Sequence, residues 1–477
     1  MNVPSPEFLA FSAVAALLFN AGGAVWWRRM VLFIANALFL ASFSHDLGAF
    51  MPFAGFLLLG YGAQRVTWNK GNRRLFPVLL IVTLAAFFWL KRYSFIPSEA
   101  FLPFPYVLIG LSYVFFRVIH LIVDSYEGDV AKPVDPLSYL NYTLNFTSLV
   151  SGPIQRYQDY HAMETEPLAL DLPVAGRALE RIIVGYFKIA ILSMLLSQAQ
   201  HHAADALKDA RTLPESVWLG AQIVAIYPLY LYCNFSGYVD VVIGVARFFR
   251  IALPENFNRP FSAGNFLDFW SRWHITLSQW LKTYVFTPLM LLMMKRVTAP
   301  SLAPFLAVIA FFVTFFLVGI WHGQTSVFVM FGFLQGLGVS GNKLYQVVMA
   351  LWLGKKGYKE LAKNALYHAV SRGLTFTWFA FTLIFFWGDW NQIDALKDDL
   401  GWTGGAAVLA AIWVVATVTL ALWETLRARV LSIGGAGRSW VMSHYVRTAE
   451  ATALAAVTLA ILLLLNAPAP DIVYKAF

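Results

Sequence analysis

The chain has 477 residues, of which 59% are hydrophobic and only 13% are charged, and its net charge is +9. Soluble domains carry about 25% charged residues, so these charges are too few to cover a soluble surface. Together with a mean hydropathy of +0.63, this composition predicts a membrane protein. The excess of Lys and Arg is typical of cytoplasmic loops between membrane helices and does not indicate nucleic-acid binding.

Apolar runs of membrane-spanning length recur along the chain. Residues 75–90, 104–123, 404–423 and 451–467 form runs that approach or reach the ~20 residues needed to cross the hydrocarbon as a helix. Short alternating segments typical of barrels are absent, so helices are the remaining option. We predict an all-α polytopic membrane protein with roughly eleven to thirteen hydrophobic helices.

The beginning of the chain predicts a retained first helix. No Lys or Arg precedes the first apolar run, and the first basic pair, Arg28–Arg29, follows it. A cleaved signal peptide carries its positive charge before that run. We therefore expect the N-terminus to lie outside the cytoplasm.

Two stretches, 124–160 and 252–287, mix proline and polar residues with apolar pieces too short to cross a membrane. Non-spanning pieces at membrane depth are tolerated only where they are buried in protein or line a wet cavity. We expect a functional site in these regions.

The second stretch has the spacing of one amphipathic helix. Its aromatic face comprises Trp270, Trp273, Leu277, Trp280 and Tyr284. His274, Ser278 and Lys282, each four residues apart, fall on another face. The alternative to a functional role is an interfacial anchor whose His274 faces water.

A carboxylate lies within the apolar segment 230–250, where Ser236 and Asp240 share a helical face with Tyr232. Such a carboxylate must be neutralised, paired or hydrated. We favour a structural role for Asp240, as an acceptor of hydrogen bonds or a partner of Arg247 or Arg272.

A histidine, His322, separates two long apolar runs within GIWHGQTS, 319–326. The gap is so short that His322 must lie at a helix end or on a buried break. The alternative to a functional role is a ring whose nitrogens are satisfied by backbone carbonyls. His201 and His202 resemble a metal cluster only loosely, and we expect no metal site.

The residue types favour acyl transfer. The sequence has no GxSxG, CxxC or HExxH motif and no phosphate-binding glycine loop. A neutral imidazole can take a proton from a hydroxyl as its oxygen attacks an acyl carbon. The alternative from another class is a proton-coupled transporter or polymer-export component, with His274, Asp240 and His322 as a proton relay.

Five motifs resemble the membrane-bound O-acyltransferase (MBOAT) family, in its bacterial branch of alginate O-acetyltransferases and teichoic-acid D-alanyl transferases. The longest is ENFNRPFSAGNFLDFWSRWHITLSQWLKTYVFTPL, and IWHG places His322 48 positions after its His274. The others are GLSYVFFRVIHLIVDSYEG, LVSGPIQRYQDY and YLYCNFSGYVDVVIGVARFF. The resemblance runs from about residue 105 to 340.

The resemblance implies a fold with short re-entrant helices around a central channel. It divides the chain into N-terminal membrane helices (1–100), a core with the active site (101–350) and C-terminal membrane helices (351–477). It makes His322 catalytic, at the meeting point of a cytoplasmic and an extracytoplasmic channel, and His274 the second catalytic histidine. The residues expected to bind substrate or line the channel are Trp321, Asn258, Trp273, Ser236, Asp240 and Ser278.

The resemblance also implies a function in the bacterial plasma (inner) membrane. An acyl group, in the first place acetyl, would pass from a cytoplasmic thioester of coenzyme A or an acyl carrier protein to an extracytoplasmic polysaccharide. The thioester is a substrate, and no bound cofactor is expected. Expected partners are membrane lipid, polymer-biosynthesis proteins and a separate secreted or membrane-tethered acyltransferase of the SGNH/serine-hydrolase type. The alternatives are D-alanyl transfer to a teichoic-acid-like polymer and acylation of a lipid or protein.

Overall fold

The computed structural model describes residues 1, 3, 5–441 and 444–465. These residues form helices, with an isolated antiparallel β-bridge between Phe257 and Trp273. The chain divides into two compact units. Unit 1 comprises Met1–Ile189 and Phe235–Glu255, and unit 2 comprises Ala190–Asn234 and Asn256–Leu464.

Unit 1 contains eight α-helices and the C-terminal part of α10 among its described residues. Their bounds are α1 Pro6–Ala21, α2 Val25–Ala41, α3 Met51–Trp68, α4 Phe76–Leu90, α5 Leu111–Glu127, α6 Pro136–Thr143, α7 Tyr157–Thr165, α8 Leu172–Phe187 and α10 Leu213–Phe248. The short helices of this unit are η1 Leu47–Phe50, η2 Lys70–Leu75 and η3 Ser98–Ala100. A π-helical segment, η4 Lys188–Ser193, follows α8.

Unit 2 contains the remaining helices. Their bounds are α9 Met194–Leu207, α11 Phe266–Trp270, α12 Ile275–Leu281, α13 Thr287–Arg296, α14 Ala303–His322, α15 Ser326–Trp352, α16 Gly354–Leu361, α17 Ala365–Trp387, α18 Trp390–Val441 and α19 His444–Leu465. The short helices are η5 Pro260–Ser262, the π-helix η6 Lys282–Phe286 and η7 Pro300–Leu302.

Local chemistry explains several helix starts. Asp135 and Asp171 accept hydrogen bonds from backbone N–H groups three residues later, at 3.0 and 2.8 Å, and each is followed within two residues by proline. Such a cap satisfies an N–H group that has no partner inside the helix, and proline at the first positions loses no helical hydrogen bond. Asn364 caps α17 in the same way.

Seven helices in the described part of the chain are long and apolar enough to cross a membrane. They cover Leu47–Trp68, Gly71–Leu90, Leu172–Leu207, Leu213–Phe248, Pro300–His322, Ala365–Trp387 and Trp390–Arg429. The apolar helices α1, α2 and α5 have only 16 or 17 residues each. The prediction of an all-α polytopic membrane protein is confirmed.

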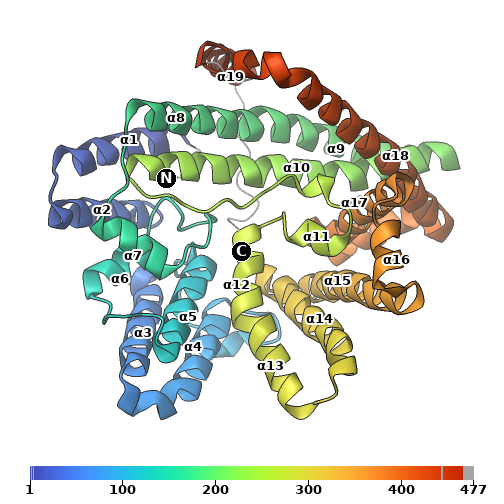
Figure 1. The fold of residues 1–477 in the computed structure, drawn as a ribbon. Coiled ribbons are helices and arrows are strands. Elements are labelled where there is room, and N and C mark those ends of the chain that lie inside the picture. Colours follow the sequence, from blue (N-terminus) through green and yellow to red (C-terminus); the bar gives the residue numbers. More distant parts are fainter. Residues whose placement is uncertain (2, 4, 442–443, 466–477) are drawn as a thin grey trace. The chain divides into compact units, whose positions relative to one another are not determined.

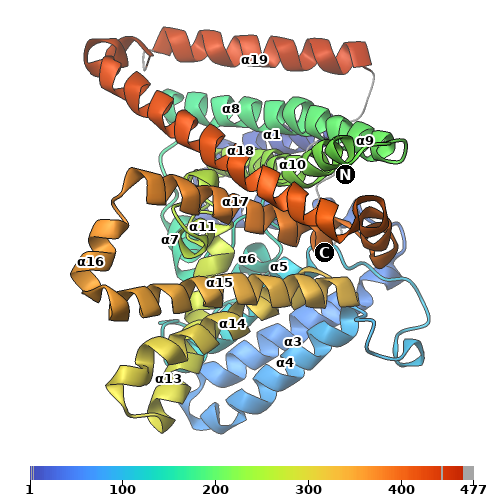
Figure 2. The ribbon, with the colours of Figure 1, turned by 90° about the vertical axis from the view of Figure 1, so that its right-hand side faces the viewer.

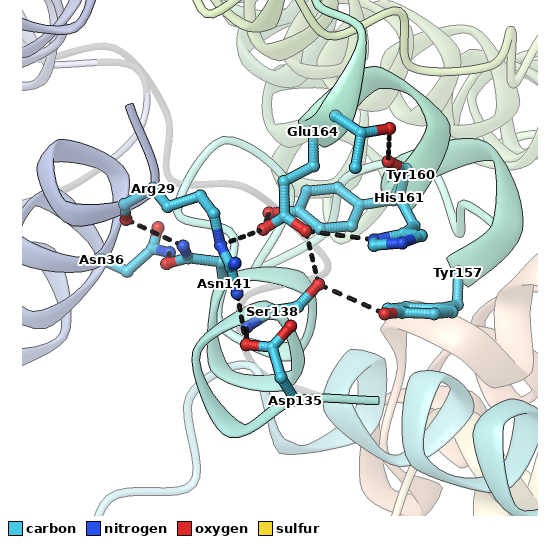
Figure 3. Close-up of polar contacts among 10 residues, drawn as sticks. Arg29, Asn36, Asp135, Ser138, Asn141, Tyr157, Tyr160, His161 and Glu164 are labelled. Atoms are coloured by element: carbon cyan, nitrogen blue, oxygen red, sulfur yellow. Dashed lines mark hydrogen bonds and ion pairs between the residues drawn. The ribbon is translucent and has the colours of Figure 1, made fainter. Parts of the chain in front are cut away.

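In unit 1, α3 packs against both α4 and α5 (Figure 1). The segment 124–160, predicted to be non-spanning, contains the end of α5, the eight-residue α6 and the start of α7. Its polar side chains meet around Glu164 (Figure 3), which accepts hydrogen bonds from Ser138 at 2.5 Å and Tyr160 at 3.2 Å. Arg29 of α2 pairs with the same carboxylate and with Asp135. These contacts hold α2, α6 and α7 together.

In unit 2, α14 and α15 form an antiparallel hairpin, and α17 packs against both α15 and α18 (Figure 2). A core of seven buried apolar residues joins α10, α17 and α18: Val224, Phe376, Ala380, Ile384, Val408, Ile412 and Ala416. The packing of α17 against α15 and α18 matters for the site because both predicted catalytic histidines lie in this unit.

Candidate active site

His322 is the last residue of α14 and is 2% exposed. The ring of Trp321 lies 4.6 Å from the imidazole, centroid to centroid. Phe331 of α15 lies 5.8 Å away and Phe386 of α17 lies 5.2 Å away, both edge-on. The prediction that His322 lies at a buried helix end is confirmed, and three aromatic rings from three helices surround it.

The two glycines of GIWHG permit close packing around this histidine. A Cβ atom at Gly319 would lie 2.1 Å from the Cα of Gly332 on α15, and one at Gly323 would lie 1.9 Å from the ring of Phe328. Real atoms do not approach so closely, so only glycine fits at these positions. The contact between Gly319 and Gly332 fixes the position of His322 along the axis of α15.

His274 is held in a strained turn. Its backbone has φ 44° and ψ 54°, the left-handed region that costs a non-glycine residue roughly 1–2 kcal/mol. Asn256 fixes this turn: its carbonyl accepts the N–H of Ile275 at 2.9 Å, and its Oδ1 accepts the N–H and hydroxyl of Thr276 at 3.1 and 2.7 Å. His274 is 1% exposed and lies outside the seven candidate spans. Burial lowers its pKa to about 3, so its imidazole is neutral at physiological pH.

The expectation of one amphipathic helix through this region is wrong. The turn at His274 separates α11 from α12, and residues 282–286 are π-helical. The interfacial-anchor alternative is also wrong, because His274 is buried instead of facing water. Tertiary contacts override helical spacing here: the segment 256–258 pairs with 272–275 through the Phe257–Trp273 bridge and the Asn256 hydrogen bonds.

Helix α17 connects the surroundings of the two histidines. The ring of Phe379 lies 5.1 Å from that of Trp273, next to His274, whereas Phe386, seven residues later, contacts His322. Residues seven apart lie on the same face of a helix and are separated by about 10 Å along its axis. The two histidines therefore lie in one buried region, next to positions about 10 Å apart along the axis of α17. We call these two positions the levels of His274 and His322.

Of the six residues expected to bind substrate or line the channel, four lie in unit 2. Trp273 and Trp321 are buried, and Ser278 is half-buried. Asn258 is exposed and contributes a backbone hydrogen bond from its N–H to the carbonyl of Arg272, at 2.9 Å. Substrate contacts for these four residues stay predictions.

The other two, Ser236 and Asp240, lie in unit 1. Asp240 accepts hydrogen bonds from Arg181 Nε at 2.9 Å and Lys188 Nζ at 2.6 Å. Arg181 also makes a bidentate pair with Glu255, with both distances at 2.5 Å. The prediction that Asp240 accepts structural hydrogen bonds from a neighbouring helix is confirmed, whereas the alternative pairing with Arg247 or Arg272 is wrong. Arg181 of α8 and Lys188, the first residue of η4, supply the cations because α8 approaches α10 closely: a Cβ atom at Gly237 would lie 2.7 Å from the carbonyl oxygen of Gly185.

Two buried polar residues near the histidines did not stand out in the sequence. Asn256 fixes the His274 turn, and Gln335 of α15 donates from Nε2 to Thr382 Oγ1 of α17, at 2.9 Å. The only sequence signal at Gln335 is a polar residue inside an apolar helix, and at Asn256 a polar residue shortly before the WSRWH segment.

The comparison with known proteins decides between the enzyme and the transporter. The sequence model of the membrane-bound O-acyltransferase family matches residues 125–386, more than half of the chain and a region that contains both histidines. The chain belongs to this family. It is an O-acyltransferase and a multi-pass membrane protein.

Similar proteins within the family are named for different polymers. The chain is 27% identical to the teichoic acid D-alanyltransferase of Bacillus subtilis (strain 168) over 75% of its own length and 90% of that protein. It is also 27% identical to the probable alginate O-acetylase AlgI of Azotobacter vinelandii, over 82% of this chain and 79% of that protein. The chain is 33% identical to the peptidoglycan O-acetyltransferase of Helicobacter pylori (strain ATCC 700392 / 26695), over 44% of this chain and 38% of that protein.

Proposed function

We propose that this acyltransferase moves an acetyl group from a cytoplasmic thioester to a hydroxyl of an extracytoplasmic polysaccharide, in the bacterial plasma membrane. The observation that carries the proposal is the buried His322 at the end of α14, enclosed by rings from three helices. Such a site excludes water, which would otherwise hydrolyse the acyl group. Alginate and peptidoglycan O-acetyltransferases among the similar proteins support the choice of acetyl and of a polysaccharide.

In the proposed reaction, His322 takes the proton of the attacking hydroxyl. The hydroxyl oxygen forms a bond to the acyl carbon, the carbon–sulfur bond breaks, and the proton passes to the departing thiolate. The neutral His274 and the Asn256 amide lie at the adjacent level, where they can orient substrate or stabilise developing negative charge. The donor is a thioester of coenzyme A or a carrier protein.

A partner of the SGNH/serine-hydrolase type completes transfer to the polymer in this proposal. The support is the resemblance to the alginate branch and a sequence without a GxSxG motif. D-Alanyl transfer is the second candidate, supported by similarity over 90% of a D-alanyltransferase.

The decisive experiment is His322→Ala in the native host. Loss of a general base typically lowers the rate 10²- to 10⁴-fold, so polymer esters should disappear while the protein level in the membrane stays at that of wild type. The measurement is ester content of purified polymer by NMR, which also separates acetate from D-alanine. His201→Ala, which changes an exposed histidine of unit 2, is the matched control and should retain its esters. Normal ester content in His322→Ala would remove its catalytic role.

A further inference from the structure

Gln335 and Thr382 form a buried polar pair between the levels of the two histidines. Both residues are 0% exposed. Gln335 lies four residues after Phe331 on α15, and Thr382 lies four residues before Phe386 on α17; these are the two phenylalanines that contact His322. Four residues are about one helical turn. The pair therefore lies one turn from His322, on the side towards Phe379 and the His274 turn.

The orientation of the Gln335 amide is fixed by hydrogen bonding. The Thr382 hydroxyl donates to the carbonyl of Phe379 at 2.8 Å, so its oxygen is left to accept from Gln335 Nε2 at 2.9 Å. The carbonyl oxygen Oε1 of Gln335 is buried, and no donor in the described part of the chain reaches it. A buried acceptor without a donor destabilises a fold by roughly 1–3 kcal/mol.

A second glutamine shows what distinguishes this position. Gln64 of α3 in unit 1 is also 0% exposed and donates to Ser125 Oγ at 3.0 Å, and its Oε1 likewise has no donor among the described residues. Its described hydrogen bond leads to another helix of unit 1, whereas Gln335 lies one turn from the rings around His322. Proximity to the reacting centre, and not burial alone, makes Gln335 a candidate for substrate binding.

We propose that Gln335 Oε1 accepts a hydrogen bond from the amide N–H of the phosphopantetheine arm of the acyl donor. This proposal rests on the proposed function. The arm is common to coenzyme A and carrier proteins, and its nearest amide is separated from the sulfur by two methylenes. A helical turn of about 5.4 Å between Gln335 and the Phe331 ring that contacts His322 suits that spacing. This hydrogen bond holds the thioester carbon next to His322. Gln335 therefore selects acyl donors that carry the amide over thioesters that lack it.

The test compares two acetyl thioesters, one of N-acetylcysteamine, which keeps the amide, and one of an alkanethiol of equal length, which lacks it. Thiol release by detergent-purified protein, with de-esterified envelope polysaccharide of the native host present to accept the acetyl group, gives kcat/KM for each. Wild type should favour the amide thioester by roughly tenfold, the value expected for a buried neutral hydrogen bond. Gln335→Met should bring this ratio close to one by slowing the amide thioester alone.

Gln64→Met is the matched control, because it removes the same chemical group from unit 1 and should keep the wild-type ratio. The ratio is measured within one protein, so it does not depend on yield. Thr382→Val, which frees the Gln335 amide to rotate, should lower the ratio and serves if Gln335→Met does not fold. An unchanged ratio in Gln335→Met or, failing that, in Thr382→Val overturns the assignment and leaves the proposed function standing. Absence of thiol release from both thioesters by wild type overturns the proposed function instead.

Discussion

The polar cluster around Glu164 in unit 1 and the region of the two histidines in unit 2 use buried polar groups in opposite ways. Both oxygens of Glu164 are paired, with Ser138 and His161 on one and Tyr160 and Arg29 on the other (Figure 3). In the histidine region, Asn256 Nδ2 and Gln335 Oε1 are buried without a partner in the described part of the chain. A complete network holds helices together, whereas an incomplete one leaves groups that a substrate can engage.

The largest effect is expected at Gly319. Because Gly319 supports the packing of unit 2, a large loss of stability there would show that unit 2 also depends on structural contacts and is not purely catalytic. Gly319→Ala places a methyl group 2.1 Å from the Cα of Gly332, where only backbone movement can relieve the clash. We expect a loss of stability of about 4 kcal/mol or more and loss of acyl transfer. Thermal unfolding in detergent measures it. Gly341→Ala, at a helical position with open space, is the control and should remain stable; equal stability of the two variants would contradict the packing argument.

Glu164→Ala should lower stability by about 3 kcal/mol, because it leaves Arg29 and two hydroxyls without their buried acceptor. The Glu164 side chain is 5% exposed. The kcat/KM of the folded fraction should equal that of wild type. Glu166→Ala, at an exposed neighbour, should change neither quantity. A drop in kcat/KM without a loss of stability would contradict the structural role and show that the Glu164 cluster takes part in acyl transfer.

Substitutions at His274 separate its ring from its backbone. His274→Gly and His274→Ala both remove the imidazole and should lower acyl transfer about 10²-fold if the ring takes part in catalysis. Glycine adopts the left-handed conformation freely, so the glycine variant should be more stable than the alanine variant by about 1 kcal/mol. Near-normal activity of His274→Gly would reduce the residue to a structural role.

The buried His274 also predicts a pH dependence of stability. Its pKa is lowered to about 3, whereas the unfolded chain binds this proton near the ordinary histidine value of about 6.5. The unfolded state therefore binds more protons between these values, and stability should fall as the pH falls from about 6.5 towards 3. Unfolding curves of wild type and His274→Asn over this range should show a weaker pH dependence in the variant.

The smallest effect is expected for Asn256→Ala, which removes the Oδ1 acceptor of Thr276 but keeps the backbone of the turn. We expect activity to fall about tenfold and stability by roughly 1–2 kcal/mol. Gln279→Ala, at an exposed position of α12, should behave as wild type in both measurements. Equal activities for the two variants would mean that the turn needs no side-chain support.

Sequence reasoning reached what local patterns determine. A histidine between two long apolar runs had to lie at a helix end, and His322 does. The rings of Phe331 and Phe386 come from helices that follow later in the chain, so their contacts were not visible in the motif. At His274, helical spacing predicted a continuous helix, but Asn256 and the Phe257–Trp273 bridge break it.

The partners of Asp240 could not be predicted from the sequence for the same reason. A carboxylate in an apolar segment had to be paired, but the choice of Arg181 and Lys188 follows from the glycine contact between α8 and α10. Composition and hydrophobic length determine the fold class, whereas partners across helices depend on packing.

The hairpin of α14 and α15 restricts changes in chain length as well as changes of residue. Only Gly323, Gln324 and Thr325 connect the two helices, and Gly319 touches Gly332 across the hairpin. One residue inserted within α15 before Phe331 would turn the rest of that helix by about 100°. Phe331 and Gln335 would then face away from His322. Insertions and deletions should therefore be much rarer between residues 319 and 335 than in the polar connection between α16 and α17.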